Sequence, residues 1–281
     1  DGELTLADRW IIASLNEKIE LVTRLMEKYD LGEAGKNLYE LIWDDFCDWY
    51  IELAKPRLFA PEGSREKLVI QNLLNIILVK ILKLLHPFMP FITEEIYQNL
   101  PGHGETIMLE WWPKPVKLDK TDEAILDMQS IMSIIRAIRN IRAEFNINPG
   151  QAIKVQLLVR EARQLSMLVD NLSYIREMAN ASEITAGQEL ARVPQAVSAI
   201  TAAAEIYVPL EGIIDVDKEL VRLNKELQST LKDIEKSEVK LNNEQFLSRA
   251  PQEVISKEKA KVEEGNIKKE GIIKRLQILQ S

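Results

Sequence analysis

The chain has 281 residues, a formal net charge of −8, one cysteine and two histidines. Its length predicts about two domains, and 46% hydrophobic residues supply a sizeable core, which excludes disorder throughout. A single cysteine excludes a disulfide framework, and one cysteine with two histidines cannot build a Cys/His zinc cage. The longest apolar stretch, residues 68–85, is interrupted by polar and charged side chains, and no signal pattern opens the chain. We therefore expect a cytoplasmic protein that does not cross a membrane.

Residues 4–145 predict consecutive amphipathic helices. Thr5 and Asp8 form a near capping box before the first of them, and Gly32 and Gly35 are expected to punctuate it. Pro56 is expected to stop the second helix, because proline cannot continue the hydrogen-bond ladder.

Further signals complete the predicted helical bundle, residues 1–148. Ser64 should open a third helix, apolar nearly all round and therefore central, and Pro90 a fourth. Residues 101–115 hold too many prolines and glycines for a helix and predict an extended crossover, which a long helix follows over residues 119–145.

The pattern changes after residue 148. Residues 149–212 predict a small α+β module, with strands near 153–159, 183–185, 197–201 and 205–210 and a helix over 162–178. Residues 213–281 place apolar side chains at steps of three, four and seven, with a break over 242–250 and a restart at Pro251. This pattern predicts an antiparallel coiled-coil hairpin.

Charge is distributed unevenly along the chain. Residues 213–281 contain 14 Lys and Arg against 13 Asp and Glu, a net charge of +1, whereas the remainder carries −9. Such asymmetry suggests that the two ends meet different partners, without identifying them.

The residue types that catalysis requires are scarce. No Gly-rich phosphate loop occurs, and His86 and His103 lie far in sequence from Cys47. We interpret His86 as a structural residue at a helix end and Cys47 as a packed side chain. We therefore expect no catalytic residue and no metal site in this chain.

Two sets of basic residues could each play either of two roles. Arg136, Arg139 and Arg142 step along one predicted helix, where they could contact phosphates or pair with the acidic bundle. The lysines of the hairpin could likewise contact phosphates or form ordinary i, i+4 ion pairs. Charge alone favours ion pairs on the hairpin and decides nothing for the arginines.

Several motifs carry a resemblance. The strings FCDWYIELAKPRL (46–58) and LLHPFMPFITEE (84–95) resemble the anticodon-binding bundle of class I aminoacyl-tRNA synthetases for valine, isoleucine and leucine. IRNIRAE (138–144), IDVDKELVRL (214–223) and the turn LNNEQF (241–246) with APQEV (250–254) are similar to the valyl-tRNA synthetase branch.

This resemblance implies a mainly α protein: a helical anticodon-binding domain (1–148), the α+β module (149–212) and a coiled-coil tRNA-binding arm (213–281). It further implies the C-terminal part of a larger ligase, whose HIGH and KMSKS motifs for ATP do not occur in this sequence. ATP, magnesium, valine activation and editing would then belong to the parent enzyme. The implied partners are valine tRNA and the parent's catalytic and editing domains, and we expect a monomer.

The resemblance also assigns candidate binding residues. The bundle is expected to hold the valine anticodon through Lys55, Arg57, Arg136, Arg139 and Arg142. The arm is expected to meet the tRNA corner, where the D and T loops join, through Lys225, Lys232, Lys236, Lys240, Phe246, Lys257 and Lys261. Two alternatives stay open: a coiled-coil scaffold that binds no RNA, and an isoleucyl or leucyl sibling, which shares the bundle but would lack this hairpin.

Overall fold

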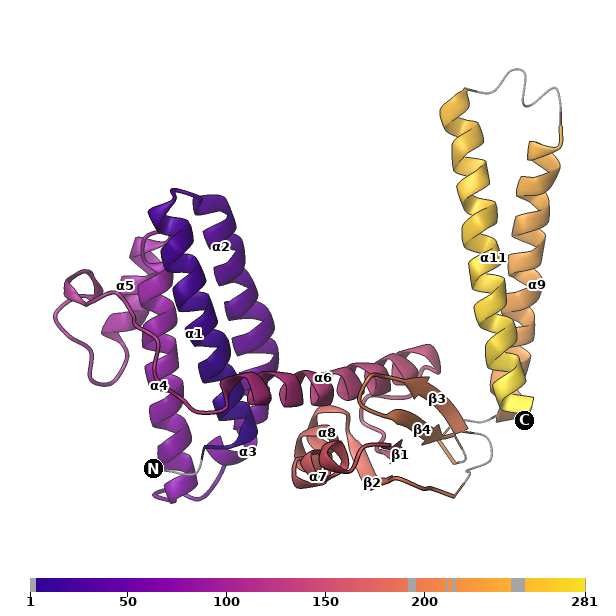
Figure 1. Cartoon of the computed structure of the whole chain (residues 1–281). Helices are drawn as coiled ribbons and strands as arrows, with labels where there is room; N and C mark the ends of the chain where they lie inside the picture. Colours follow the sequence, from indigo (N-terminus) through magenta and orange to yellow (C-terminus); the bar gives the residue numbers. More distant parts are fainter. Residues whose placement is uncertain (1–3, 192–195, 211, 214–215, 244–250, 281) are drawn as a thin grey trace. The chain divides into compact units, whose positions relative to one another are not determined.

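The computed structural model describes residues 4–191, 196–210, 212–213, 216–243 and 251–280 (Figure 1). Its contacts divide the chain into two compact units, Asp1–Ile135 with Ser166–Met178 and Arg136–Leu165 with Ala179–Ser281. The division falls inside the long helix α6 (Thr121–Glu144). The three domains expected from the sequence stay a prediction beside this observation.

The first unit begins with α1 (Leu6–Glu27), which the predicted capping box starts. The Asp8 N–H donates to Thr5 Oγ1 at 3.3 Å, and the Thr5 N–H donates to Asp8 Oδ2 at 3.0 Å. The helix then buries apolar side chains at helical spacing, among them Ile11, Leu15 and Ile19. The expected first helix is confirmed, and its buried face forms one side of the bundle core.

Helix α2 (Leu31–Glu40), the π-helical η1 (Leu41–Ile51) and α3 (Glu52–Leu58) follow one another directly. Two expectations are wrong here. Gly32 and Gly35 lie inside α2, and Pro56 lies inside α3. Proline removes one backbone donor, and this loss does not end the helix here, which continues for two residues past Pro56.

Helix α4 (Arg65–Leu85) begins as expected, since the Ser64 hydroxyl accepts from the Lys67 N–H. Helix α5 (Pro90–Gln98) has its proline in the first turn, also as expected. The crossover contains one short 3₁₀ turn, η2 (Ile107–Leu109). Leu82, Tyr97 and Ile107 form a small buried cluster that joins α4, α5 and η2.

The expectation that α4 is buried nearly all round is wrong for the described residues. Ile70 and Ile77 are buried, whereas Leu68 and Ile76 stay about half exposed. By length and composition this helix could cross a membrane, with a mean hydropathy of 1.9, but core helices of soluble proteins share that composition.

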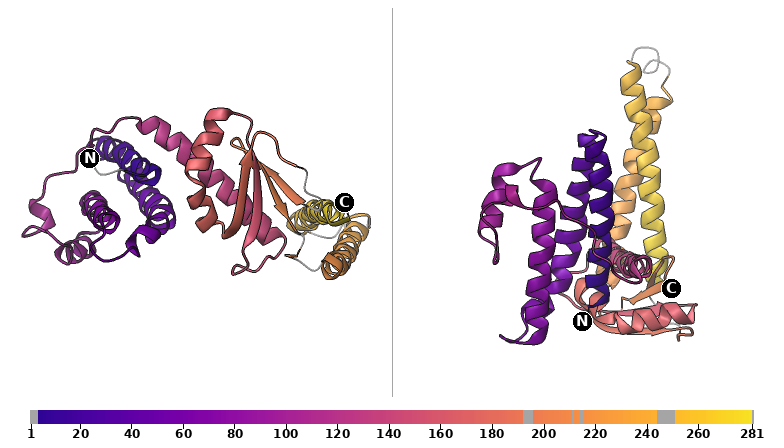
Figure 2. Two further views of the ribbon diagram at one scale, coloured as in Figure 1. Left: turned by 90° about the horizontal axis from the view of Figure 1, so that it is seen from below. Right: turned by 60° about the vertical axis from the view of Figure 1, so that its left-hand side comes forward.

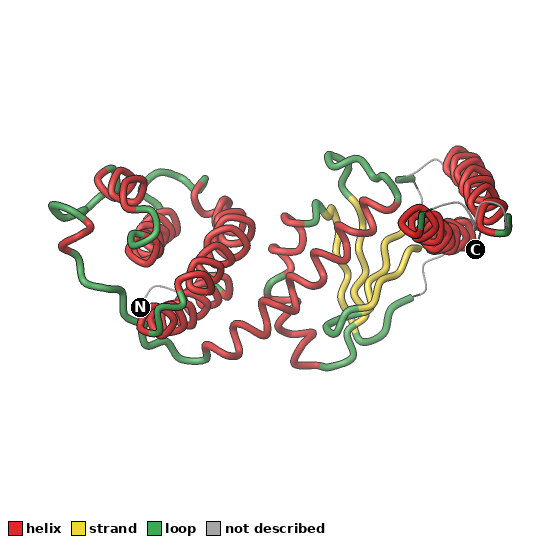
Figure 3. The backbone as a smooth tube through the Cα atoms, turned by 90° about the horizontal axis from the view of Figure 1, so that it is seen from above, coloured by secondary structure: helices red, strands yellow, loops and turns green. Residues whose placement is uncertain are grey.

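The second unit contains a four-stranded sheet in the order β2-β1-β4-β3. Its strands are β1 (Ile153–Leu158), β2 (Ala181–Gly187), β3 (Ala196–Ile200) and β4 (Glu205–Pro209). They lie side by side in Figure 3, with β1 parallel to β2 and antiparallel to β4. All four strands were predicted from the sequence pattern.

The helix expected over 162–178 is two helices, α7 (Ala162–Asp170) and α8 (Leu172–Met178). Asn171 separates them: its N–H donates to the Leu168 carbonyl, and its side-chain amide donates to the Met167 carbonyl at 2.8 Å. Asparagine side chains compete in this way with the helical ladder, so the chain turns there.

The hairpin is confirmed as α9 (Val216–Leu241) and α11 (Gln252–Gln280), which run antiparallel side by side (Figures 1 and 2). Leu223 and Ile234 of α9 and Ile272 and Leu276 of α11 are buried in the seam between the two helices. We call this hairpin the arm. The mainly helical fold class, with a bundle, a small α+β module and a helical arm, is thus as predicted.

Candidate nucleic-acid interface

Arg57 closes a buried ion pair between α1 and α3. Its two terminal nitrogens donate to the two carboxylate oxygens of Asp8 at 2.7 and 2.5 Å. The Tyr50 hydroxyl donates to the same carboxylate at 2.7 Å. The Asp8 side chain is fully buried and that of Arg57 is 17% exposed. The guanidinium expected at the anticodon therefore joins two helices of the bundle.

The electrostatics agree with this geometry. Burial by itself raises the pKa of Asp8, but the hydrogen bonds from Arg57 and Tyr50 outweigh it and leave the pKa below its ordinary value. Burial and the adjacent Asp8 carboxylate raise the pKa of Tyr50. Asp8 is therefore ionised and Tyr50 is a neutral donor at neutral pH.

Lys55 is placed differently, although it lies two residues from Arg57. Its Nζ contacts Glu52 Oε1 at 2.6 Å within α3, and its side chain is 47% exposed. Exposed pairs of this kind contribute little to stability, so the ammonium can exchange Glu52 for another anion at small cost.

The three arginines of α6 also separate into two kinds. Arg142 is buried, and its Nη2 donates to the carbonyls of Asn148, Pro149 and Gln151 at 2.7, 3.1 and 2.8 Å. Burial lowers its pKa. Arg136 and Arg139 are exposed. Arg142 thus holds the segment that leads into β1, whereas the other two guanidiniums reach the surface.

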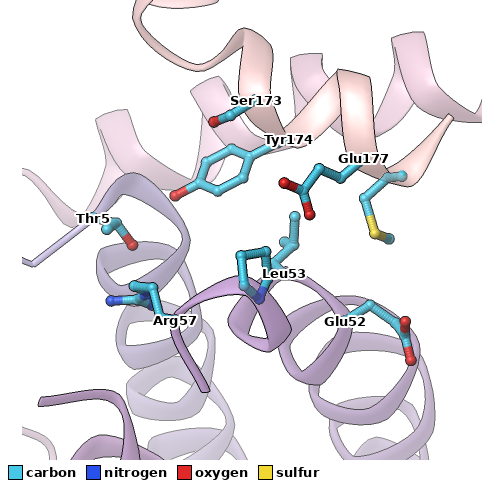
Figure 4. A pocket seen from close by; sticks show the side chains of 9 residues that line it. Thr5, Glu52, Leu53, Arg57, Ser173, Tyr174 and Glu177 are labelled. Atoms are coloured by element: carbon cyan, nitrogen blue, oxygen red, sulfur yellow. The ribbon is translucent and has the colours of Figure 1, made fainter. Parts of the chain in front are cut away.

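A pocket of about 200 Å³ lies beside Arg57 in the first unit (Figure 4). Tyr174 and Glu177 of α8 face Leu53 and Arg57 of α3 across it. The cation of this pocket, Arg57, is already paired with Asp8, and the carboxylates of Glu52 and Glu177 would repel a phosphate.

His86 and Cys47, the two residues considered for chemistry, both lie in the first unit. His86 caps the C-terminus of α4 as expected, and its Nδ1 lies 2.7 Å from Thr93 Oγ1. Cys47 is partly buried, and burial raises the pKa of its thiol. Within the described ranges, no group of three His, Cys, Asp or Glu side chains is arranged to hold a metal ion.

Most of the candidate lysines of the arm are exposed and paired with carboxylates. Lys236 pairs with Asp233 at 3.3 Å and Lys257 with Glu253 at 2.7 Å. Lys240 and Lys261, from opposite helices, share Glu258 Oε1 at 3.4 and 2.8 Å. Lys225 and Lys232 are exposed on α9, and Phe246 lies outside the described residues.

Two further cations join this set, although the sequence analysis did not select them. Lys268 contacts Glu226 at 3.1 Å, and Arg222 contacts Glu219 and Glu226 at 2.6 and 3.1 Å. Both lie on the same side of the buried seam as Lys240 and Lys261. Assigning heptad positions to the two helices would have found them, because residues seven apart share a side.

Comparison with known sequences gives two family matches. Residues 8–157 match the anticodon-binding domain of tRNA ligase, and residues 215–280 match the valyl tRNA synthetase tRNA binding arm. The first match covers the helical bundle and most of β1, and the second match covers the arm.

Curated relatives match almost the whole chain. They include the valine–tRNA ligases of Carboxydothermus hydrogenoformans (45% identical over 99% of this chain), Geobacillus stearothermophilus (42% over 98%) and Bacillus subtilis (40% over 98%). The chain covers 31% of each of these relatives, so it spans about a third of their length.

The match over residues 8–157 covers more than half of the chain, which therefore belongs to the family of anticodon-binding domains of tRNA ligases. The relatives and the arm match together confirm the resemblance to the valyl branch of that family. The isoleucyl and leucyl alternatives do not account for the arm match.

Proposed function

We propose that this chain is the tRNA-binding region of a valine–tRNA ligase. One observation carries the proposal: a single chain matches an anticodon-binding domain and, after it, a tRNA-binding arm. Anticodon bases are single-stranded and splayed, so side chains can stack on them and read their edges. The tRNA corner exposes backbone and loops, which suit a long rod bearing lysines.

In the bundle, we assign contact with the anticodon stem-loop to Lys55, Arg136 and Arg139. Their exposure supports this assignment. Arg57 and Arg142 would act indirectly, since Asp8 and backbone carbonyls already occupy their guanidiniums. In the arm, the lysines at 236, 240, 257 and 261, with Phe246, are the candidates for the tRNA corner. Lys225 and Lys232, which the resemblance also named, are left out of this assignment because they lie on the side of α9 away from its buried residues.

Charging tRNA with valine is proposed for the longer protein, in the cytoplasm and with ATP and magnesium bound outside this chain. The isolated chain should then not catalyse valine-dependent pyrophosphate exchange, and exchange by the purified chain would refute that division of labour. Specificity for valine tRNA, contact with the catalytic and editing domains, a monomeric state and the absence of membrane contact are parts of the same proposal.

A salt titration of valine tRNA binding tests the proposal. Phosphate contacts release counterions, so affinity should fall steeply and log-linearly with salt concentration. The alternative, a coiled-coil scaffold, is supported by the net charge of −8 and the ion-paired arm. A chain that binds no tRNA even at low salt would leave only the scaffold.

A further inference from the structure

The nearly neutral arm has two chemically different faces. The buried residues of α9 and α11 define the seam between the helices, and the flanking positions on each side of it form one face. We call the side with Lys240 and Lys261 the groove face. Its cations include Arg222, Lys236, Lys240, Lys257, Lys261 and Lys268, and the carboxylates Glu219, Glu226, Asp233 and Glu264 lie among them.

On the opposite face the described carboxylates outnumber the cations. Its flanking positions hold the carboxylates Glu235, Glu238, Glu263 and Glu270, with Lys259 as the cation among them. An α-helix with its side chains is about 10 Å across, and the screening length at physiological salt is about 8 Å. The two faces therefore present separate potentials to a ligand, and the net charge of +1 conceals them.

The groove face is also hollow. A groove of about 490 Å³ runs between α9 and α11, because small or polar residues occupy seam positions where a coiled coil normally has leucine. Thr230 and Ser237 fill such positions on α9. On α11, Gly265 lies so near Ile234 that a Cβ there would come within 2.6 Å of Ile234 Cγ1.

Four lysines line this groove from both helices: Lys236, Lys240, Lys261 and Lys268. Their side chains are 73%, 51%, 60% and 55% exposed. The carboxylate shared by Lys240 and Lys261 belongs to Glu258, whose side chain is only 7% exposed, so this anion lies beneath its lysines. An ammonium has three donors, and one ion pair leaves donors for a ligand above the groove.

We propose that the arm meets RNA with its groove face, where Lys236, Lys240, Lys261 and Lys268 contact phosphates of one backbone segment. This inference rests on the proposed tRNA-binding function and assigns the face that performs it. Lys225 and Lys232 lie on the outer edge of α9, away from the seam, and contribute little. The opposite face repels the backbone through its carboxylates.

A matched pair of double variants of the full chain tests the assignment. Lys236→Gln with Lys268→Gln removes two charges from the groove and leaves both partners of Glu258 in place. Lys225→Gln with Lys232→Gln removes two charges from the outer edge. The probe is a valine tRNA transcript, titrated at several salt concentrations, and helical content and thermal midpoint show that both variants fold.

The groove variant should bind about tenfold or more weakly near 0.1 M salt, with a log–log salt slope smaller by roughly 1.5. The edge variant should stay within about twofold of the unaltered chain. Unchanged binding by the groove variant, or an equal or larger loss in the edge variant, overturns the face assignment while the proposed function stands. If the unaltered chain does not bind the transcript, the proposed function fails, and this inference with it.

Discussion

Positive charge serves different purposes in the bundle and in the arm. Arg57 and Arg142 are buried or nearly so, and their guanidiniums are held by Asp8 and by backbone carbonyls. In the arm, Lys236 and Lys257 stay 73% and 69% exposed and pair with neighbouring carboxylates. A planar guanidinium satisfies several acceptors in fixed geometry, whereas an ammonium is a mobile point charge. The contrast separates cations that maintain the fold from cations that an anion can recruit.

Among the substitutions that test this contrast, replacement of Arg57 should lower the free energy of unfolding the most. Arg57→Met leaves the Asp8 carboxylate buried without its cation, so the free energy of unfolding should fall by about 3–5 kcal/mol. Lys55→Met, two residues away, removes an exposed pair and should cost less than about 1 kcal/mol. Urea unfolding of both variants measures the difference, and equal losses would contradict the distinction.

Arg142 offers a second comparison, within α6. Arg142→Lys keeps the charge but cannot reach three carbonyls at once, so unfolding should become easier by about 2–4 kcal/mol. Arg139→Lys changes an exposed side chain and should stay within about 0.5 kcal/mol. The account of Arg142 would be wrong if its lysine variant unfolded at the same denaturant concentration as the unaltered chain.

Substitutions at two glycines of α11 test the packing of the groove and should change stability in opposite directions. A methyl group at Gly265 would press on Ile234, so Gly265→Ala should destabilise the arm by about 1–2 kcal/mol despite better helix propensity. A methyl group at Gly271 would meet no side chain or neighbouring element within 4 Å, and Gly271→Ala should stabilise the arm by up to about 1 kcal/mol. Thermal unfolding followed by circular dichroism shows both signs, and a stabilising Gly265→Ala would refute the close approach.

Acid should weaken the arm through Glu258. Hydrogen bonds from Lys261 and Ser237 lower its pKa from 4.5 to about 2. A depressed folded-state pKa stabilises the fold above the unfolded value and loses that contribution as pH falls towards 2. The stability difference between the unaltered chain and Glu258→Gln should therefore shrink between about pH 5 and pH 2. A difference that does not change with pH would mean that Glu258 is not held as an anion.

Much of the fold could be predicted because its signals are local. The capping box at Thr5, the proline at the start of α5, the alternating strands and the heptad pattern each lie within one element. Pro56 was misread because the loss of one backbone donor does not end every helix, and α3 continues to Leu58.

The roles of the cations could be predicted only in part. Arg57 binds a carboxylate 49 positions earlier in the chain, and spacing along one helix says nothing about such a partner. Arg136, Arg139 and Arg142 read alike in sequence because they share a helix, yet only the third meets the turn after α6. The groove face could have been predicted from the sequence, since heptad positions alone place Lys261 and Lys268 on the same side of α11.

The central claim is that the bundle and the arm bind different parts of one tRNA. The most direct test measures the affinity of the chain for whole valine tRNA and for its isolated anticodon stem-loop, with and without residues 213–281. Removal of the arm should weaken whole-tRNA binding and leave stem-loop binding nearly intact. Equal losses for the two ligands would contradict the claim, because the arm would then stabilise the bundle and not contact RNA.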